Sequence, residues 1–228
     1  MSGDSRCADC PAREGGFCGR LPDELKQRFR EAVRSTGQER LTDENGAPLA
    51  TWDVAVVARG SLAIRHTFED GRRAITDYLL PGELIHADGE RARLGRQIST
   101  SSDFQVCMIP RLDGAFNTED RLCLERCIRN DANAHIENLR EMIATLARLS
   151  PRERVAHLLH SLHRKLNPEG RTIGLPFPRN DIADLIGIRV ETVSRALLDL
   201  EQAELIRREG PRKIRILDPD GLESVAGG

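Results

Sequence analysis

Cysteine is the residue type with which this chain could most clearly do chemistry, because six cysteines are grouped in a few places along its 228 residues. Cys7, Cys10 and Cys18 lie near the N-terminus, and Cys107 follows much later, directly before Met108-Ile109-Pro110. Four thiolates can hold a [4Fe-4S] cluster or a zinc ion. The spacing therefore predicts a metal centre, and redox chemistry of unligated thiols is the alternative.

The segment that carries the first three cysteines, residues 1–20, is short, glycine-rich and without apolar periodicity. We therefore expect a loop that is organised by a bound centre rather than by a core. Cys123 and Cys127 lie one helical turn apart and are interpreted as small buried residues, with auxiliary redox chemistry as the alternative. His66 and His86 are conceivable axial ligands of a haem, although each is typical of an ordinary structural or surface histidine.

A second group of chemically capable residues lies near the C-terminus, on a predicted helix from Val190 to Gln202. Glu191 and Arg195 lie one turn apart on this helix. Arginine can donate two hydrogen bonds to guanine, and glutamate can accept one from cytosine, so the pair could specify a G·C base pair. The alternative is an ion pair between the two side chains within the helix.

The residues around this helix predict how it would be presented to DNA. A short predicted helix over 179–186 ends at Gly187, and two helices joined by so tight a turn form a unit that fits the major groove. The predicted core face of the second helix comprises Val193, Leu197 and Leu200, and its opposite face comprises Val190, Glu191, Ser194 and Arg195. A basic hairpin over 205–216 is expected to form a wing.

The remaining sequence divides into a β-rich part and a long helix. Between residues 52 and 110, apolar and polar residues alternate, as in Leu62 to Phe68, which predicts an antiparallel β-domain. From 119 to 149 the apolar spacing alternates between four and three, a heptad pattern that favours pairing with a second chain. This predicted dimer seam comprises Ile128, Ala132, His135, Leu139, Met142, Leu146 and Leu149. A second stripe through Ile136 and Ile143 could then pack on the β-domain; the alternative is that the helix packs only on its own chain.

Composition narrows the function classes. Hydrophobic residues make up 39% of the chain and charged residues 31%, with a net charge of -2, which is typical of a globular protein. No apolar run approaches the ~18 residues of a membrane span, and the N-terminus lacks a signal peptide, so we expect a cytoplasmic protein with reduced thiols. No catalytic triad, phosphate-binding glycine loop or dinucleotide fingerprint is present, so we expect no enzyme activity; a cluster-bearing electron carrier or enzyme is the remote alternative.

Several stretches resemble the CRP/FNR superfamily of bacterial regulators. Ile182–Gly187 followed by Val190–Arg195 is similar to its recognition signature, and Val57–Gly60 with Leu80–Leu84 is similar to its sensor domain. The resemblance implies an α+β fold with an N-terminal antiparallel β-roll (a cupin-like jelly roll), a long dimerisation helix and a C-terminal winged helix-turn-helix. It also implies a homodimer that binds a palindromic operator in double-stranded DNA and contacts RNA polymerase. The implied division is a Cys-rich cluster-binding loop 1–20, a β-roll 21–118, a dimerisation helix 119–149 and a DNA-binding domain 150–228.

The DNA-reading residues resemble the FNR type within this family, which implies operators related to TTGAT and ATCAA. The residues implied to contact DNA are Arg189, Val190, Glu191, Thr192, Ser194 and Arg195. Arg189 departs from the family pattern, because relatives often carry a Ser or Thr helix cap at its position. An arginine there could contact a phosphate instead.

The cysteines resemble those of oxygen-sensing FNR regulators, in which three N-terminal cysteines and one before an Ile-Pro hold a [4Fe-4S] cluster. The implied ligands are Cys7, Cys10, Cys18 and Cys107. The implied signal is oxygen or redox state, and nitric-oxide sensing through haem is an alternative. Residues 95–100 do not match the family's cyclic-nucleotide cassette. The best-studied FNR-type sensors carry an acidic residue in the dimer helix that opposes pairing of cluster-free chains, but the corresponding residue here is Leu139.

Overall fold

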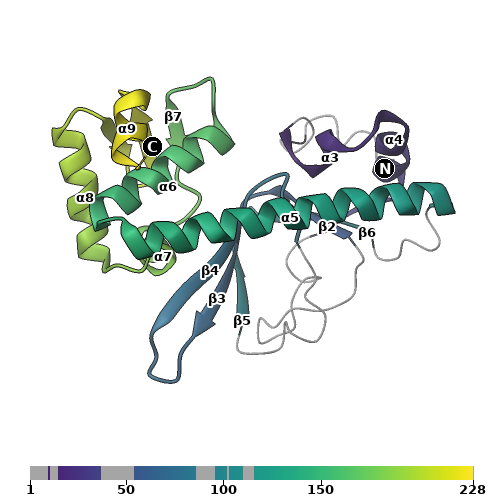
Figure 1. Cartoon of the computed structure of the whole chain (residues 1–228), viewed down its shortest axis with the longest axis horizontal. Helices are drawn as coiled ribbons and strands as arrows, with labels where there is room; N and C mark the ends of the chain where they lie inside the picture. The colour runs from purple at the N-terminus through teal and green to yellow at the C-terminus, as the bar shows by residue number, and fades with distance from the viewer. Residues whose placement is uncertain are drawn as a thin grey trace. The chain divides into compact units, whose positions relative to one another are not determined.

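The computed structural model describes residue 10 and residues 15–36, 54–85, 96–101, 103–109 and 116–227. The chain divides into two compact units, Met1–Glu137 and Asn138–Gly228. The long helix α5 (Thr118–Arg148) contributes to both units (Figure 1). No helix in the described part of the chain combines the length and the apolar character needed to cross a membrane.

In the described part of the first unit, two antiparallel three-stranded sheets form the centre. The first has the order β1-β6-β2 (Arg34–Thr36, Gln105–Ile109, Val54–Arg59), and the second has the order β4-β3-β5 (Arg73–Leu79, Leu62–Thr67, Arg96–Thr100). Successive side chains of a strand point to opposite faces, and both faces of β2 are buried. Ala55 and Val57 join one apolar cluster, and Val54 and Val56 join another. The predicted antiparallel β-domain is therefore confirmed.

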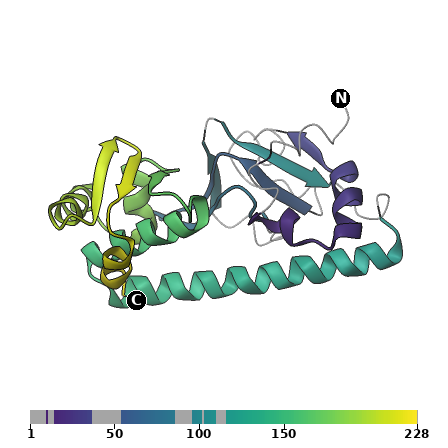
Figure 2. The same cartoon turned by 90° about the horizontal axis from the view of Figure 1, so that it is seen from above.

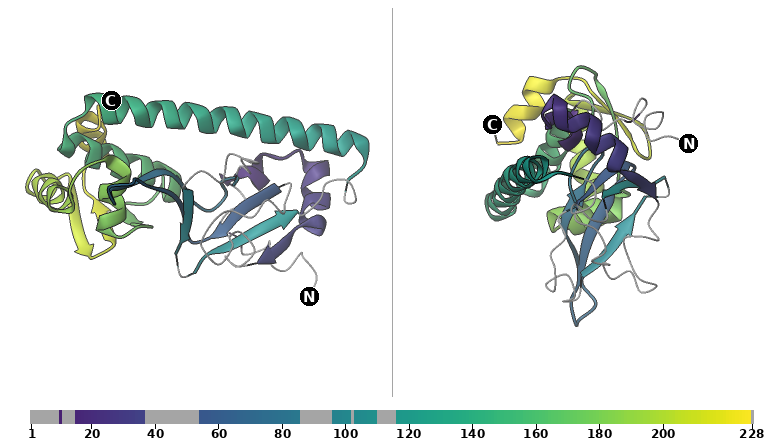
Figure 3. Two further views of the ribbon diagram at one scale, coloured as in Figure 1. Left: turned by 90° about the horizontal axis from the view of Figure 1, so that it is seen from below. Right: turned by 90° about the vertical axis from the view of Figure 1, so that its right-hand side faces the viewer.

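Two short helices cover the Val54 and Val56 face of the first sheet. α3 (Phe17–Arg20) and α4 (Asp23–Ala32) are drawn in purple beside the strands in Figures 2 and 3. The rings of Phe17 and Phe29 meet edge to face with their centroids 5.9 Å apart. Phe17 is only 1% exposed, so the expectation of a coreless loop over 1–20 was wrong for the described end of that segment.

Gly16 permits the close approach of this N-terminal segment to the β-domain. The backbone N–H of Phe17 donates to the carbonyl oxygen of Gly82 at 2.7 Å. A Cβ atom on Gly16 would lie 2.3 Å from the Cα of Gly82, which no side chain could tolerate. Ion pairs of Arg20 with Asp131 and of Arg28 with Asp120 then join α3 and α4 to α5.

The second unit contains the last turns of α5 and four further helices: α6 (Pro151–Leu166), α7 (Arg179–Ile186), α8 (Val190–Gln202) and α9 (Pro219–Val225). Its sheet has the order β7-β9-β8 (Thr172–Gly174, Lys213–Ile216, Ile206–Gly210). α6 starts at a capping box in which Ser150 and Glu153 exchange hydrogen bonds. The predicted fold class, with a long helix and a C-terminal winged helix-turn-helix, is confirmed.

Candidate nucleic-acid interface and cysteine site

Gly187 makes the turn between α7 and α8. Its φ of 66° and ψ of 39° lie in the left-handed region, which glycine adopts without a steric cost. Its N–H and that of Ile188 both donate to the carbonyl oxygen of Ala183, the latter at 3.1 Å, which closes the end of α7. The helix-turn-helix geometry that the sequence predicts is therefore present.

α8 has one buried face and one solvent-facing face. Val193, Leu197 and Leu200 are buried in the unit's core, as predicted. Glu191 and Arg195 are exposed, while Val190, Thr192 and Ser194 are half-buried. The Ser194 hydroxyl donates to the Val190 carbonyl oxygen at 3.1 Å.

No ion pair joins Glu191 to Arg195 among the described residues, so the alternative of an intrahelical pair is not realised. Arg189 occupies the N-cap of α8, and its side chain makes no capping hydrogen bond. It is exposed, which leaves its guanidinium facing solvent at the start of the helix. Arg189 and Arg195 offer hydrogen-bond donors, which suit phosphates and guanine, and Glu191 offers an acceptor, which suits cytosine.

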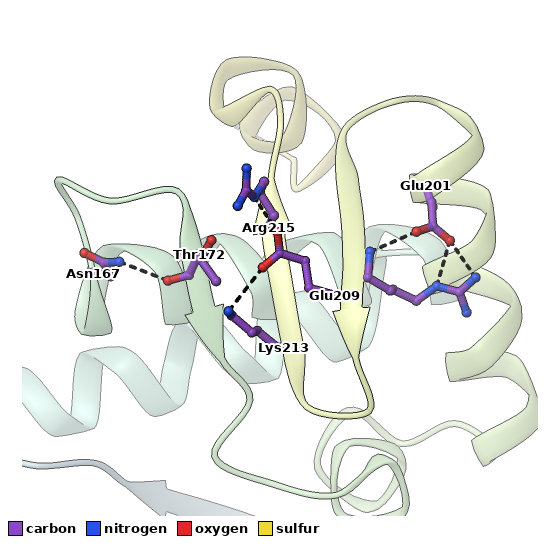
Figure 4. A network of polar contacts seen from close by, with 7 residues as sticks. Asn167, Thr172, Glu201, Glu209, Lys213 and Arg215 are labelled. Atoms are coloured by element: carbon purple, nitrogen blue, oxygen red, sulfur yellow. Dashed lines mark hydrogen bonds and ion pairs between the residues drawn. The ribbon is translucent and has the colours of Figure 1, made fainter.

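The positive charge of the wing is partly neutralised, because two glutamates form ion pairs with its cations (Figure 4). Glu201 accepts from the backbone N–H and the guanidinium of Arg208, each at 2.8 Å, and these hydrogen bonds hold the pKa of Glu201 below its usual value. Glu209 pairs with Arg215 at 2.6 Å and with Lys213 at 3.5 Å. Glu209 lies on β8 and its two partners lie on β9, so the antiparallel pairing of the predicted hairpin could have indicated these contacts from sequence.

The described cysteines lie around the first sheet and its covering helices. Cys107 pairs with Val56 across β6 and β2, and by alternation it shares the face of Ile109 rather than that of Val106. Cys18 packs against the apolar cluster on that same face. The sulfur of Cys10 lies 4.0 Å from the carbonyl oxygen of Ala58, on β2.

Cys7, the fourth predicted ligand, lies outside the described residues. Within the described ranges, no group of three or more His, Cys, Asp or Glu side chains is close enough to hold a metal ion. Cys10, Cys18 and Cys107 are all half-buried and lie on or beside the same sheet, and their donor atoms are all sulfur. Sulfur is the donor atom that an iron-sulfur cluster requires. The three described cysteines are not, however, gathered into one site.

Cys123 and Cys127 are half-buried on α5 and pack on the same apolar cluster as Cys18, which fits their interpretation as core residues. Burial and the neighbouring Cys123 thiol raise the pKa of Cys127. A raised pKa lowers the thiolate fraction and hence the reactivity. His66, a conceivable haem ligand, stacks edge to face on Phe68 with centroids 4.7 Å apart. His86 lies outside the described residues.

The two apolar stripes of α5 have different surroundings from those expected. Ile128 of the predicted dimer seam packs on the core of its own chain, and Nε2 of His135 pairs with Asp77 of β4 at 2.9 Å. All seven seam residues are half-buried. The second stripe, expected to pack on the β-domain, is instead exposed: Ile136 is 45% and Ile143 is 67% exposed. The expectation for this second stripe was wrong.

Known proteins with similar sequences are regulators of transcription. Residues 153–225 match the Crp-like helix-turn-helix domain family. The chain is 30% identical to the transcriptional activator protein FnrA of Stutzerimonas stutzeri, over 98% of this chain and 93% of that protein. It is 28% identical to the transcriptional activator protein FnrL of Cereibacter sphaeroides, over 97% of this chain and 92% of that protein.

A solved structure shares the fold. FixK2 from Bradyrhizobium japonicum superposes with a TM-score of 0.69 at 23% identity, over 85% of this chain and 96% of that one. The similarity to FnrA extends through both units, and the matched domain contains the helix on which Glu191 and Arg195 are exposed. The chain therefore belongs to the CRP/FNR family of transcription regulators.

Proposed function

We propose that the chain is an oxygen- or redox-responsive regulator that acts as a homodimer on a palindromic operator related to TTGAT and ATCAA. The main observation behind the proposal is that Glu191 and Arg195 on α8 are both exposed and form no ion pair with each other in the described part of the chain. The proposal is further supported by its relatives FnrA and FnrL, and by a relative from Haemophilus influenzae that is called an anaerobic regulatory protein.

DNA reading follows from the side chains that α8 presents. Arg195 can donate two hydrogen bonds to guanine O6 and N7, and Glu191 can accept from cytosine N4. Arg189, exposed at the N-cap, is suited to a phosphate. Such phosphate contacts fix the register of the helix, while the base contacts give the sequence preference.

The signal is proposed to enter through the cysteines. Cys7, Cys10, Cys18 and Cys107 would hold a [4Fe-4S] cluster, which supplies oxygen-sensitive, reversible redox chemistry when bound. Cys18 belongs to the segment that packs on the sheet and on α5, and Cys107 belongs to the sheet itself. A cluster held by these two residues would link the N-terminal segment to the β-domain, so its loss would remove one of the contacts that hold that segment next to α5.

The dimer is proposed to form along α5. Leu122, Ile136 and Ile143 expose apolar surface along this helix, with 59%, 45% and 67% of each residue accessible. Ala132 and Leu139 are the members of the predicted seam that lie nearest to this stripe, since each residue advances the helix by about 100°. A partner chain would bury these side chains. Such a dimer on DNA would then contact RNA polymerase.

One preparation tests the proposal. The protein is purified without oxygen, its iron, sulfide and visible spectrum are measured, and its affinity for a TTGAT and ATCAA duplex is compared with that for a scrambled duplex by fluorescence anisotropy. We expect iron and sulfide, a broad absorption shoulder, and a preference for the palindrome that weakens in air.

Each part of the proposal has its own contrary result. Equal affinity for the two duplexes would refute the proposed operator. Unchanged affinity after complete cluster loss would refute the cluster as the sensor. A sharp Soret band would indicate haem, and an iron-free protein that responds to peroxide would indicate thiol sensing.

A further inference from the structure

Arg154 of α6 binds three backbone carbonyl groups with one guanidinium. Its Nε donates to Leu149 at 2.9 Å, its Nη2 to Leu146 at 2.8 Å and its Nη1 to Ile186 at 3.1 Å. Leu146 lies in the last turn of α5, Leu149 lies in the link to α6, and Ile186 is the last residue of α7. One side chain therefore joins the end of the long helix to the end of the first helix of the helix-turn-helix.

The chemistry at this point favours arginine. The last carbonyl groups of a helix lack partners within the helix and carry the negative end of its dipole. Arginine offers five N–H donors in a rigid plane, so it can reach three acceptors at once. A lysine ammonium has three donors around one point and could not span the same three carbonyl groups.

α5 also lies close to the turn between α7 and α8, as the surroundings of Gly187 show. A Cβ atom on Gly187 would lie 3.9 Å from Nη1 of Arg154 and 3.9 Å from Cδ2 of Leu146. Leu146 of α5 thus lies beside the turn that leads into α8. Leu149 lies close to Gly227 near the C-terminus, 3.3 Å from a Cβ placed there. The end of α5 is consequently held within the DNA-binding unit, which begins at Asn138.

We propose that Arg154 is a positioning residue that fixes the direction of α5 relative to the recognition helix α8, and thereby sets the half-site spacing that the dimer accepts. This inference rests on the proposed function, because it requires that the α5 helices of two chains pair with each other. Each base pair added between half-sites moves them apart by about 3.4 Å and rotates them by about 34°. A dimer whose α5 is firmly held on each helix-turn-helix cannot follow that change.

The test measures spacing preference with the full-length protein purified without oxygen. Anisotropy titrations use the palindrome, the same palindrome with one or two base pairs added at its centre, and a duplex with one half-site. The wild type is expected to lose about tenfold or more in affinity for the lengthened sites. Arg154→Met is expected to reduce that preference to about threefold or less while its affinity for the single half-site stays unchanged.

Two further variants complete the design. Arg152→Met changes an exposed arginine two residues away and should behave like the wild type. Arg154→Lys keeps the charge but not the planar donors, and an intermediate preference is expected. It also takes the place of Arg154→Met if that variant does not fold, as judged by circular dichroism.

The outcomes separate this inference from the proposed function. If the folded Arg154 variants keep the wild-type spacing preference, Arg154 does not set it. If they lose affinity equally for all duplexes, Arg154 has only a structural role, and the inference is equally refuted. Failure of the wild type to prefer a palindrome over a single half-site would instead refute the proposed dimeric function.

Discussion

At the scale of single residues, Arg195 is the side chain on which the proposed base reading depends most. It is exposed one turn from Glu191, and it can bind guanine with two hydrogen bonds. Arg195→Ala is therefore expected to cost about 1–3 kcal/mol on the palindrome and almost nothing on unrelated DNA. Anisotropy titrations with the two duplexes at one salt concentration measure the difference.

A control comes from Arg207, which is exposed on the wing strand β8. Arg207→Ala should weaken binding to both duplexes by a similar factor, because a phosphate contact carries no sequence information. If Arg195→Ala also weakened both duplexes equally, Arg195 would be a phosphate contact and the proposed G·C reading would be wrong.

The cysteines give a second prediction at this scale. Replacement of Cys7, Cys10, Cys18 or Cys107 by serine should each abolish the cluster, because serine removes a thiolate ligand. Cys123→Ser and Cys127→Ser are matched controls, since both residues are half-buried on the same core, and they should retain iron and sulfide. Iron and sulfide analysis of the six variants measures the outcome. Loss of iron only in the two control variants would reverse the ligand assignment.

At the scale of elements, the contact between α5 and β4 should depend on pH. The hydrogen bond with Asp77 raises the pKa of His135 above its ordinary value of 6.5, and Glu83 and Asp131 act in the same direction against the opposing effect of burial. A raised folded-state pKa means that protonated His135 stabilises the fold fully below about pH 6.5 and that this contribution is lost as pH rises through the folded pKa.

Thermal unfolding from pH 5.5 to 8.5 measures this dependence, in comparison with Asp77→Asn. The wild type should lose more stability than the variant over the upper part of that range. NMR titration of the His135 ring should show a lower pKa in Asp77→Asn. Identical pH profiles of the two proteins would exclude a role for the pair.

Several elements followed from sequence because a local pattern determined them. The alternation around Leu62 located β3, and Gly187 located the turn before α8. α3 was missed, because four helical residues are too few for a periodic pattern. Its position depends instead on Phe17, which is buried against residues distant in sequence.

The two stripes of α5 illustrate a limit of periodicity. The heptad pattern located a 31-residue helix correctly, but both stripes are apolar, so the pattern could not say which one meets the chain's own β-domain. The stripe that meets the β-domain contains His135, which pairs with Asp77, and Ile128, which packs on the core, and both contacts join residues far apart in sequence. The pairing of Arg208 with Glu201 was not predicted either, because it joins the end of α8 to strand β8 across a turn whose geometry no sequence pattern gives.

At the scale of the whole molecule, the proposed function requires two chains, and the family relationship covers both units of this chain. The resemblance to the family could be found from the sequence, because the motifs of the sensor domain and of the helix-turn-helix each consist of residues close together in the chain. The cysteine site is less complete, since Cys7 lies outside the described residues and the other three predicted ligands are not assembled. Residue spacing identifies four candidate thiolate ligands, but it does not give their arrangement, because a bound cluster would itself organise them.

The last prediction concerns the dimer and uses Leu139, which is half-buried beside the exposed Ile136 and Ile143. A leucine there favours pairing, because a partner helix would bury its apolar side chain. Air exposure is expected to destroy the cluster and weaken operator binding. Because Leu139 favours pairing, the cluster-free wild type should nevertheless stay at least partly dimeric. Leu139→Asp should make the cluster-free form more monomeric, because pairing would bury two carboxylates next to each other. Analytical ultracentrifugation of anaerobic and air-exposed samples at equal concentration measures both effects.

The matched control is Ala134→Asp, which adds the same charge to an exposed position. Position 134 lies about 200° around the helix from Ile136, so a carboxylate there would face away from a partner chain. Ala134→Asp should consequently sediment like the wild type in both samples. A fully monomeric cluster-free wild type would contradict the role given to Leu139. Equal dissociation in Leu139→Asp and Ala134→Asp would mean that added negative charge, rather than the apolar stripe, governs pairing, and the partner face would then have to be sought outside α5.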